Sequence, residues 1–358
     1  MRVLHIVPDS VFDSRHLHLG STKDVRGRTE YFDVRGIAFD EIAVKNRSDQ
    51  LLLERLKGIN LSHYTTAIFE LPAYPDSLLY LRRNAPQVQL LTRSINAELY
   101  HRLHYLRALA INGSGLPGVD TLKVALITMR TTFSRLRLDR LCANRSDYLL
   151  SITQWEKEHY WKYLTGAAKV TNVPYFLPRT YDEAVVAGEK KTQCVCMMST
   201  TLSTLPFLID AAKNFSKAVT RLGDELPEWE FLITGDFPSR AIKLPGRVTR
   251  TGLLATPFKV LAESRVMALL SDYGFGFKTK LLDAIHYKCY VLVLKGLYRR
   301  LPAEVQPFCI IVDTDSVDSF RSALERCREP YPDGDPNDIF RSRAFAALDE
   351  VLSVSKGK

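Results

Sequence analysis

The sequence predicts an α/β protein built from two doubly wound domains. Short apolar runs alternate with longer segments of helical period, which is the pattern of parallel strands covered by crossover helices. The length of 358 residues exceeds what one hydrophobic core usually serves, and 46% hydrophobic residues supply material for two cores. Between the halves, a polar segment with Pro174, Pro178 and Gly188 interrupts both periodicities. We expect one domain over residues 1–180, a second over 181–337, and a closing helix and tail over 338–358.

Strands and helices are expected to alternate along the chain. Short apolar runs predict strands at 2–7, 67–71, 88–94, 148–153, 194–198, 229–235, 247–252, 290–294 and 309–313. Segments of helical period predict helices at 77–84, 96–110, 122–145, 154–164, 205–222, 257–270, 278–288 and 316–328. Apolar residues recur at helical spacing in 338–354, which indicates a final amphipathic helix.

Cysteine usage and the first residues argue against several protein classes. The six cysteines form no CxxC pair and have no companion histidine spacing, so zinc and thioredoxin-like chemistry lack a signature. Cys194 and Cys196 should lie on one face of a strand as small core residues. The opening residues, "MRVLHIVP", contain no charged-then-apolar leader, and no apolar stretch is long enough to span a bilayer. We therefore expect a cytoplasmic protein.

The charge balance permits an anionic partner without specifying one. A net charge of +9 is modest for this length, and it suits a nucleotide, a phospholipid or a phosphorylated substrate. No basic tract or aromatic-basic module supports nucleic-acid binding, so we expect no nucleic-acid partner.

One stretch, "SDYGFGFKTKLLDAIHYKCYVLV" at 271–293, combines features of a phosphate site. Gly274 and Gly276 let the backbone approach a ligand, and a helix starting near Lys278 offers free N–H groups and a positive dipole end. A cation is normally disfavoured in the first turn of a helix, so the presence of Lys278 and Lys280 there indicates a bound anion, such as a diphosphate, that neutralises them. Asp283, about one turn later, could accept hydrogen bonds from ribose hydroxyls. The alternatives are two solvated lysines and an exposed helical aspartate beside an ordinary glycine turn.

The string "GFGFKTKLLDAI", preceded by "WEFLITGD" and "RVTRTGLL", resembles the carboxy-terminal domain of GT-B glycosyltransferases. It is most similar to the large retaining group that includes sucrose synthase and many bacterial polysaccharide and lipopolysaccharide transferases. The resemblance implies two Rossmann-like domains facing across a cleft, with the donor nucleotide-sugar held by the glycine loop, its helix and the strand that ends at Gly235. Asp283 matches the acid that holds ribose in that group.

The string also departs from the pattern of the group. Phe275 stands eight positions before Asp283, where the group has a glutamate that helps to position the donor sugar. The basic pair that usually follows the first strand of this domain is missing from "CVCMMSTTLSTLPF", and Lys278 and Lys280 are the available substitutes.

The first half carries a second part of the resemblance. "TRSINAELYHRLHYLRAL" is similar to the strand-loop-helix segment at the cleft of that group, with Arg93, Asn96 and Glu98 in an R-x-x-N-x-E string, followed by His101. The resemblance implies that these four residues are catalytic. Their position after an expected strand end favours this reading, because open parallel sheets bind ligands at the carboxyl ends of their strands. Alternatively, Arg93 is an ordinary surface ion-pair partner, Glu98 supports a first helical turn, and His101 is a satisfied interhelical histidine.

The segment 122–145 is a basic amphipathic helix. It carries six Lys or Arg residues and one acid, Asp139. Such a helix could rest on anionic lipid, which would place the protein peripherally on the inner membrane face. The alternative, equally open, is the solvated outer face of a domain helix.

The resemblance implies a glycosyltransferase that moves a sugar from a nucleotide-sugar donor to a hydroxyl of a glycan, lipid-linked or protein acceptor. Retention of configuration and independence from metals are implied in the same way, with no cofactor beyond the donor substrate, in polysaccharide, glycolipid or glycoprotein synthesis. Two alternatives remain. The loss of the first acid at Phe275 favours a binding or scaffolding subunit without turnover. A nucleotide-sugar epimerase would show further carboxylates around the sugar.

Overall fold

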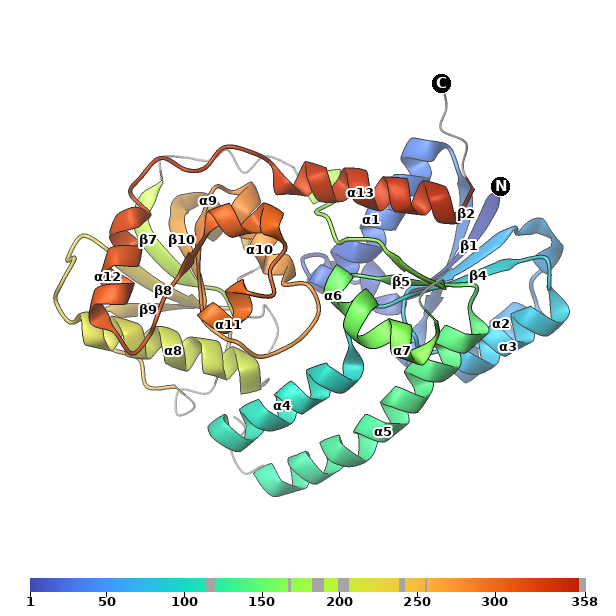
Figure 1. The fold of residues 1–358 in the computed structure, drawn as a ribbon, viewed down its shortest axis with the longest axis horizontal. Helices are drawn as coiled ribbons and strands as arrows, with labels where there is room; N and C mark the ends of the chain where they lie inside the picture. Colours follow the sequence, from blue (N-terminus) through green and yellow to red (C-terminus); the bar gives the residue numbers. More distant parts are fainter. Residues whose placement is uncertain are drawn as a thin grey trace.

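The computed structural model describes residues 1–113, 120–166, 169–181, 190–198, 206–237, 242–254 and 256–353. These residues form two α/β units, each with a six-stranded parallel sheet (Figure 1). The strand order is β2-β1-β3-β4-β5-β6 in the first sheet and β12-β11-β10-β7-β8-β9 in the second. Gly188, expected to interrupt the chain between the units, lies outside the described residues.

The first unit contains the strands β1 to β6 and the helices between them. Its elements are β1 (Arg2–Pro8), α1 (Gly20–Arg35), β2 (Ala38–Val44), α2 (Asp49–Lys57), β3 (Thr66–Phe69), α3 (Pro75–Asn84), β4 (Gln89–Arg93), α4 (Glu98–Asn112), α5 (Thr121–Arg145), β5 (Tyr148–Ser151), α6 (Gln154–Glu156), α7 (Lys162–Leu164) and β6 (Val170–Asn172). Buried side chains of α2, α3 and α5 pack on one face of the sheet, and those of α1 pack on the other.

The second unit repeats the design. Its elements are β7 (Lys191–Cys196), α8 (Pro206–Leu222), β8 (Glu230–Thr234), β9 (Val248–Gly252), α9 (Phe258–Glu263), β10 (Ser264–Leu269), α10 (Thr279–His286), β11 (Tyr290–Val293), α11 (Lys295–Tyr298), β12 (Cys309–Ile311), α12 (Val317–Arg326) and α13 (Pro336–Val351). Helices α8 and α12 cover one face, and α9 and α10 cover the other. Because both faces are covered, β11 is buried at all four positions. Cys194 and Cys196 pack in one core cluster, as expected of two residues on the same face of β7.

The sequence-based expectation of one helix over 257–270 is wrong. The chain forms α9 only as far as Glu263 and then enters β10, which pairs with β7 and β11 in the middle of the sheet. The hydroxyl of Ser264 donates to the carbonyl of Val260 at 2.6 Å, where the helix ends. A continuous apolar run carries no period, so a central strand and the end of a helix look alike in sequence.

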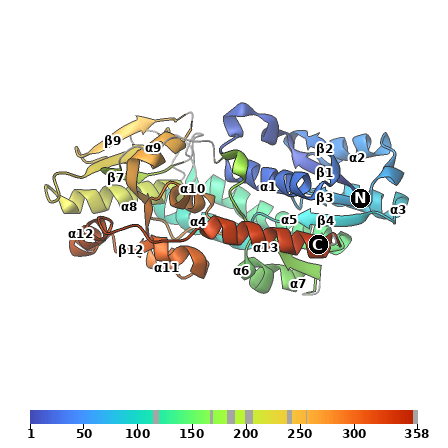
Figure 2. The same ribbon diagram turned by 90° about the horizontal axis from the view of Figure 1, so that it is seen from above.

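Helix α13 leaves the second unit and lies along the first (Figure 2). Near its end, the carboxylate of Asp349 accepts from Tyr31 at 2.9 Å and from Arg35 at 2.8 Å, both on α1. Near its start, the side chain of Asn337 bonds the backbone N–H and carbonyl of Leu177 in the connecting segment. The two units therefore share one continuous apolar cluster that includes side chains of α1, α10 and α13. Among the described helices, none has the length and apolar character needed to cross a bilayer.

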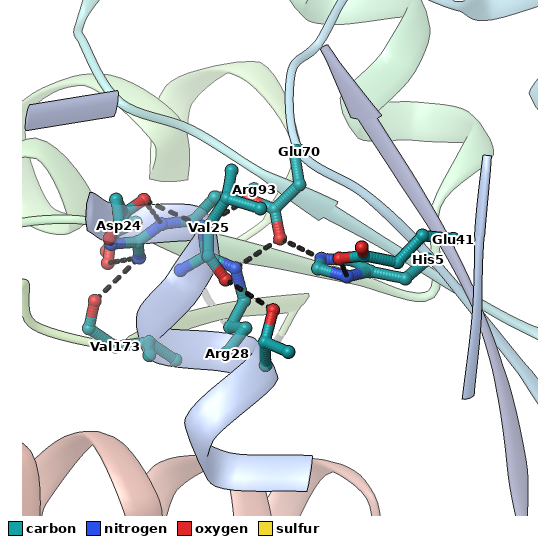
Figure 3. Close-up of polar contacts among 10 residues, drawn as sticks. His5, Asp24, Val25, Arg28, Glu41, Glu70, Arg93 and Val173 are labelled. Atoms are coloured by element: carbon teal, nitrogen blue, oxygen red, sulfur yellow. Dashed lines mark hydrogen bonds and ion pairs between the residues drawn. The ribbon is translucent and has the colours of Figure 1, made fainter. Parts of the chain in front are cut away.

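A chain of buried charges runs through the first unit (Figure 3). The guanidinium of Arg93 forms two bonds with Asp24, at 2.9 and 2.8 Å, and Arg28 bonds both Asp24 and Glu70. Glu70 also contacts His5 Nε2 at 2.6 Å. Burial opposes the charged form of Asp24, but Arg28 and Arg93 outweigh it and hold the pKa of that carboxyl well below its usual range. Each of these buried charges therefore has a partner of opposite charge, which offsets the cost of removing it from water.

Replacing Arg93 should therefore destabilise the fold. Arg93→Met should lower the free energy of unfolding by about 3–5 kcal/mol, because it removes one partner of a buried ion pair. Urea unfolding followed by circular dichroism would measure the loss. Arg2→Met is the control, since Arg2 pairs with Asp40 at 2.7 Å on the surface, and it should change stability little. Equal losses in the two variants would contradict a stabilising role for the buried chain of charges.

Candidate functional site

The glycine turn after β10 lies against the first unit. Gly274 and Gly276 have φ angles of 85° and 90°, in the left-handed region that favours glycine. A Cβ atom at Gly276 would lie 2.3 Å from the side-chain amide of Asn96 and 2.7 Å from the carbonyl oxygen of Ile95. Both the backbone conformation and the close approach of the other unit therefore require glycine at position 276.

The backbone of Phe275, between the two glycines, is held by two of the residues expected to be catalytic. Its N–H points to Nδ1 of His101 at 3.4 Å. The side-chain amide of Asn96, oriented with its nitrogen toward the turn, donates to the Phe275 carbonyl at 2.9 Å. Burial lowers the pKa of His101, and the nearby Lys278 lowers it further, so the neutral ring can accept this bond. The structure thus brings together the two segments that the sequence singled out separately.

The ring of Phe275 fills an aromatic cluster contributed by the first unit. Its centroid lies 4.5 Å from His104, 4.7 Å from Trp155 and 5.4 Å from Tyr100. The guanidinium of Arg300 lies over the same ring at 5.1 Å and donates to the carbonyl of Gly274 at 3.0 Å. Where the resembling group has a glutamate, this chain therefore has an aromatic anchor between the units.

Two lysines stand at the start of α10. Lys278 is the N-cap residue, and its Nζ donates to the Tyr273 carbonyl at 2.9 Å; Lys280 Nζ donates to the Met197 carbonyl at 3.1 Å. Within the described ranges, neither lysine has a carboxylate within ion-pair distance. Burial, with Arg300 and Lys280 nearby, lowers the pKa of Lys278 to about 7, and burial lowers that of Lys280 to about 8. A bound anion would supply the missing negative charge at this helix N-terminus.

Asp283, expected to hold ribose, contacts the first unit. Its Oδ1 accepts from Nζ of Lys23 at 2.7 Å, and both side chains are buried. The ammonium of Lys23 also lies 5.4 Å from the ring of Tyr181 and 5.3 Å from that of Phe258. The role of Asp283 toward a ligand stays a prediction, and any ribose hydroxyl would meet a carboxylate that is already ion-paired.

Lys23 was missed by sequence reasoning, and so was the start of α1. Gly20, the first residue of α1, approaches α10 so closely that a Cβ atom there would lie 2.2 Å from Thr279 Oγ1. The available signal was a glycine followed by small residues and a lysine, "LGSTK", a dozen residues after β1. Two helix N-termini therefore meet at the boundary between the units.

Glu98 lies at the start of α4 beside two cavities. A cavity of 290 Å³ between α4 and α5 is lined by Glu98, His101, Arg102, Tyr105 and Thr128. A smaller one of 90 Å³ is also lined by Glu98 and includes Asn96, Arg135 and Asp139. Burial raises the pKa of Asp139 to about 7, although a bond from the Tyr160 hydroxyl at 2.6 Å opposes this.

Arg93 and Gly235 differ from the other expected site residues in their surroundings. Arg93 is fully buried; besides Asp24, its guanidinium bonds the carbonyls of Ser151 and Val173 at 3.1 and 2.6 Å. These contacts occupy the guanidinium within the first unit. The ion pair is buried, so the expectation of a surface pair is wrong, and a catalytic role for Arg93 stays a prediction. Gly235 has a φ of 95° and donates to the Gly252 carbonyl at 2.7 Å, which joins the ends of β8 and β9.

No group of three or more His, Cys, Asp or Glu side chains is placed to hold a metal ion in the part of the chain that the structure describes. The expectation that the reaction needs no metal and no cofactor stays a prediction.

Solved structures share the architecture over nearly the whole chain. No protein-family model and no curated protein matches the sequence. Sucrose-phosphate synthase from Thermosynechococcus elongatus matches with a TM-score of 0.59 at 12% identity, over 99% of this chain and 96% of that one. HepE from Anabaena, solved with UDP, matches at 0.55 and 12%, over 99% and 97%. A Listeria monocytogenes protein assigned as a UDP-N-acetylglucosamine 2-epimerase matches at 0.55 and 11%, over 99% and 97%.

The chain has the GT-B fold. Two Rossmann-like domains face each other, with the glycine turn and α10 of one opposite α1 and α4 of the other, and the expected fold class is confirmed. At these identities the likeness establishes architecture, and a function has to be argued from the site.

Binding of a diphosphate ester at α10 should weaken as the pH rises. UDP-glucose is a suitable probe, because its diphosphate has no proton to lose between about pH 6 and pH 9. Free Lys278 and Lys280, with pKa values of about 7 and 8, lose their charge over this range, so at higher pH the two lysines must take up protons when the anion binds. Calorimetric titration should show the dissociation constant rising at least tenfold.

Two lysine variants and a control locate the effect. Lys278→Met and Lys280→Met should each weaken binding at low pH and flatten its pH dependence. Lys295→Met, which removes an exposed cation from the same domain, should behave as the unaltered chain. A pH dependence as steep in both site variants as in the unaltered chain would place the titrating groups elsewhere.

Proposed function

We propose that this chain transfers a sugar from a nucleotide-sugar donor to an acceptor hydroxyl. The observation that carries the proposal is the start of α10: a glycine turn and two cations without a carboxylate partner among the described residues, opposite the segment with Asn96, Glu98 and His101. HepE, which shares the fold, was solved with UDP, and so a uridine diphosphate sugar is the first donor to test.

The donor side would work by electrostatics. In sugar transfer, negative charge develops on the leaving diphosphate, and fixed N–H dipoles with nearby cations stabilise that charge. The free N–H groups of α10, Lys278 and Lys280 would do this without a metal ion. Asp283, positioned by Lys23, would accept a hydrogen bond from ribose.

The acceptor side would lie in the cavity between α4 and α5. Glu98 and His101 both line it, and His101 also contacts the glycine turn. An acceptor hydroxyl in this cavity would therefore approach the donor from the side of the first domain. Holding donor and acceptor together in one site converts a bimolecular reaction into an effectively unimolecular one, which lowers the activation barrier. Retention of configuration at the transferred sugar is proposed from the resemblance of the sequence to the retaining group of GT-B glycosyltransferases.

Glu98→Gln should separate binding from chemistry. A positioned acid or base contributes roughly 10²–10⁴-fold to rate, so kcat should fall by about a hundredfold or more while the dissociation constant for the donor stays nearly constant. Release of nucleoside diphosphate from a panel of donors, with and without acceptors, measures the first quantity, and calorimetry measures the second. Glu158→Gln, an exposed change in the same domain, is the matched control. Equal losses of donor affinity and kcat would contradict the assignment of Glu98 to the acceptor side.

A binding subunit without turnover is the second candidate, and Phe275 favours it. The ring occupies the position of the family glutamate and is packed among Tyr100, His104 and Trp155. This reading expects donor binding with no release of diphosphate under any condition. An epimerase would instead convert one nucleotide-sugar into another without any acceptor, so the identity of the nucleotide-sugar after incubation separates it from a binding subunit.

A further inference from the structure

Helix α5 exposes a stripe of large apolar side chains. Leu122, Leu126, Met129 and Phe133 follow one another at spacings of four, three and four residues, so they lie on one face of the helix. Their exposed fractions are 66%, 57%, 53% and 75%. We call these four residues the α5 stripe. From Leu122 to Phe133 it extends about 16 Å along the helix axis.

The α5 stripe has no covering element in the described structure. Thr128 and Thr132, on a different face of α5, are buried, so the domain uses that face and leaves the stripe outward. Figure 1 shows α4 and the first part of α5 along the lower edge of the molecule, while the end of α5 reaches the first domain. Exposed apolar side chains that are aligned, rather than scattered, mark an interaction surface.

Basic residues border the stripe along one side. Lys123, Arg130 and Arg137 recur every seven residues, so they form a row beside the apolar face, and all three are exposed. The only acid within α5, Asp139, is buried. Asp120, the N-cap residue of α5, is the one exposed acid at the start of the helix, so the surface combines apolar side chains with an excess of positive charge.

We propose that the α5 stripe and its basic row dock on an anionic lipid bilayer, with α5 lying in the plane of the interface. Apolar side chains would enter the boundary between head groups and acyl chains, and the cations would contact lipid phosphates. A second copy of the chain suits the surface less well, because self-association through this face brings the same three cations close to one another. The proposal stands on α5 alone and does not rest on sugar transfer.

Docking would also orient the cavity that holds Glu98. Helix α5 contributes Thr128 to that cavity, between α4 and α5. A membrane beneath α5 would bring the hydroxyl of a lipid-linked acceptor close to the cavity entrance. This extension rests on the proposed function, and it is tested separately by activity on a lipid-linked acceptor against a soluble one.

Vesicle flotation with the full chain tests the docking itself, without any nucleotide. The probes are vesicles of phosphatidylcholine alone and of phosphatidylcholine mixed with phosphatidylglycerol. The unaltered chain should float with the mixed vesicles and at least tenfold less with neutral ones. The joint change Leu126→Ser, Met129→Ser and Phe133→Ser should lower partitioning at least tenfold. Lys123→Gln, Arg130→Gln and Arg137→Gln together should lower it on the order of a hundredfold, at about fivefold per cation near the surface.

Matched controls remove the same number of exposed apolar or basic side chains elsewhere. The first control changes Val34, Leu51 and Tyr163 to Ser; their exposed fractions are 54%, 50% and 73%. The second changes the exposed cations Lys259, Lys295 and Arg299 to Gln, which alters net charge by the same amount. Both controls should float like the unaltered chain, and circular dichroism should show every variant folded.

Three results would overturn the proposal. One is that the unaltered chain floats with neither kind of vesicle. Another is that the stripe variant partitions as well as its control. The third is a dimer in sedimentation that the stripe variant converts to a monomer without any vesicle binding, which would identify a second copy as the occupant of this surface.

Discussion

Two adjacent residues near the start of α1, Lys23 and Asp24, form buried ion pairs, one with each domain. Asp24 points into its own domain and bonds Arg93, while Lys23 reaches across to Asp283 of the other domain at 2.7 Å. All four side chains are buried, so each charge depends on its partner, and moving α1 would leave charges unmatched in both domains. The position of α1 is therefore fixed relative to β4 on one side and α10 on the other.

This constraint determines how the candidate site is assembled. With α1 and α10 tied by Lys23 and Asp283, the glycine turn before α10 is brought against α4, where Asn96 and His101 bind the backbone of Phe275. Donor-side and acceptor-side groups then face each other although they belong to different domains. The proposed chemistry needs this arrangement, because transfer requires both reactants in one closed space.

Sequence patterns predicted the elements that are locally distinctive. The apolar run of β11 and the glycine turn before α10 were both found, since each needs only its own residues. Strand β2 was not expected, because charged residues such as Asp40 and Glu41 obscure the alternation of an edge strand. The ion pair of Lys23 with Asp283 joins residues 260 positions apart, and no local period reports such a contact. Arg93 matched a family string, but its burial is visible only in three dimensions.

Amide hydrogen exchange of the full chain, with and without a nucleotide-sugar such as UDP-glucose, tests the central claim most directly. If the diphosphate binds at the start of α10, exchange should slow in the segment 274–283, where free N–H groups would gain an acceptor. The segment 96–101 should slow with it, because Asn96 and His101 hold the same turn. Unchanged exchange in both segments at a ligand concentration that saturates binding would contradict the account and place the ligand elsewhere on the fold.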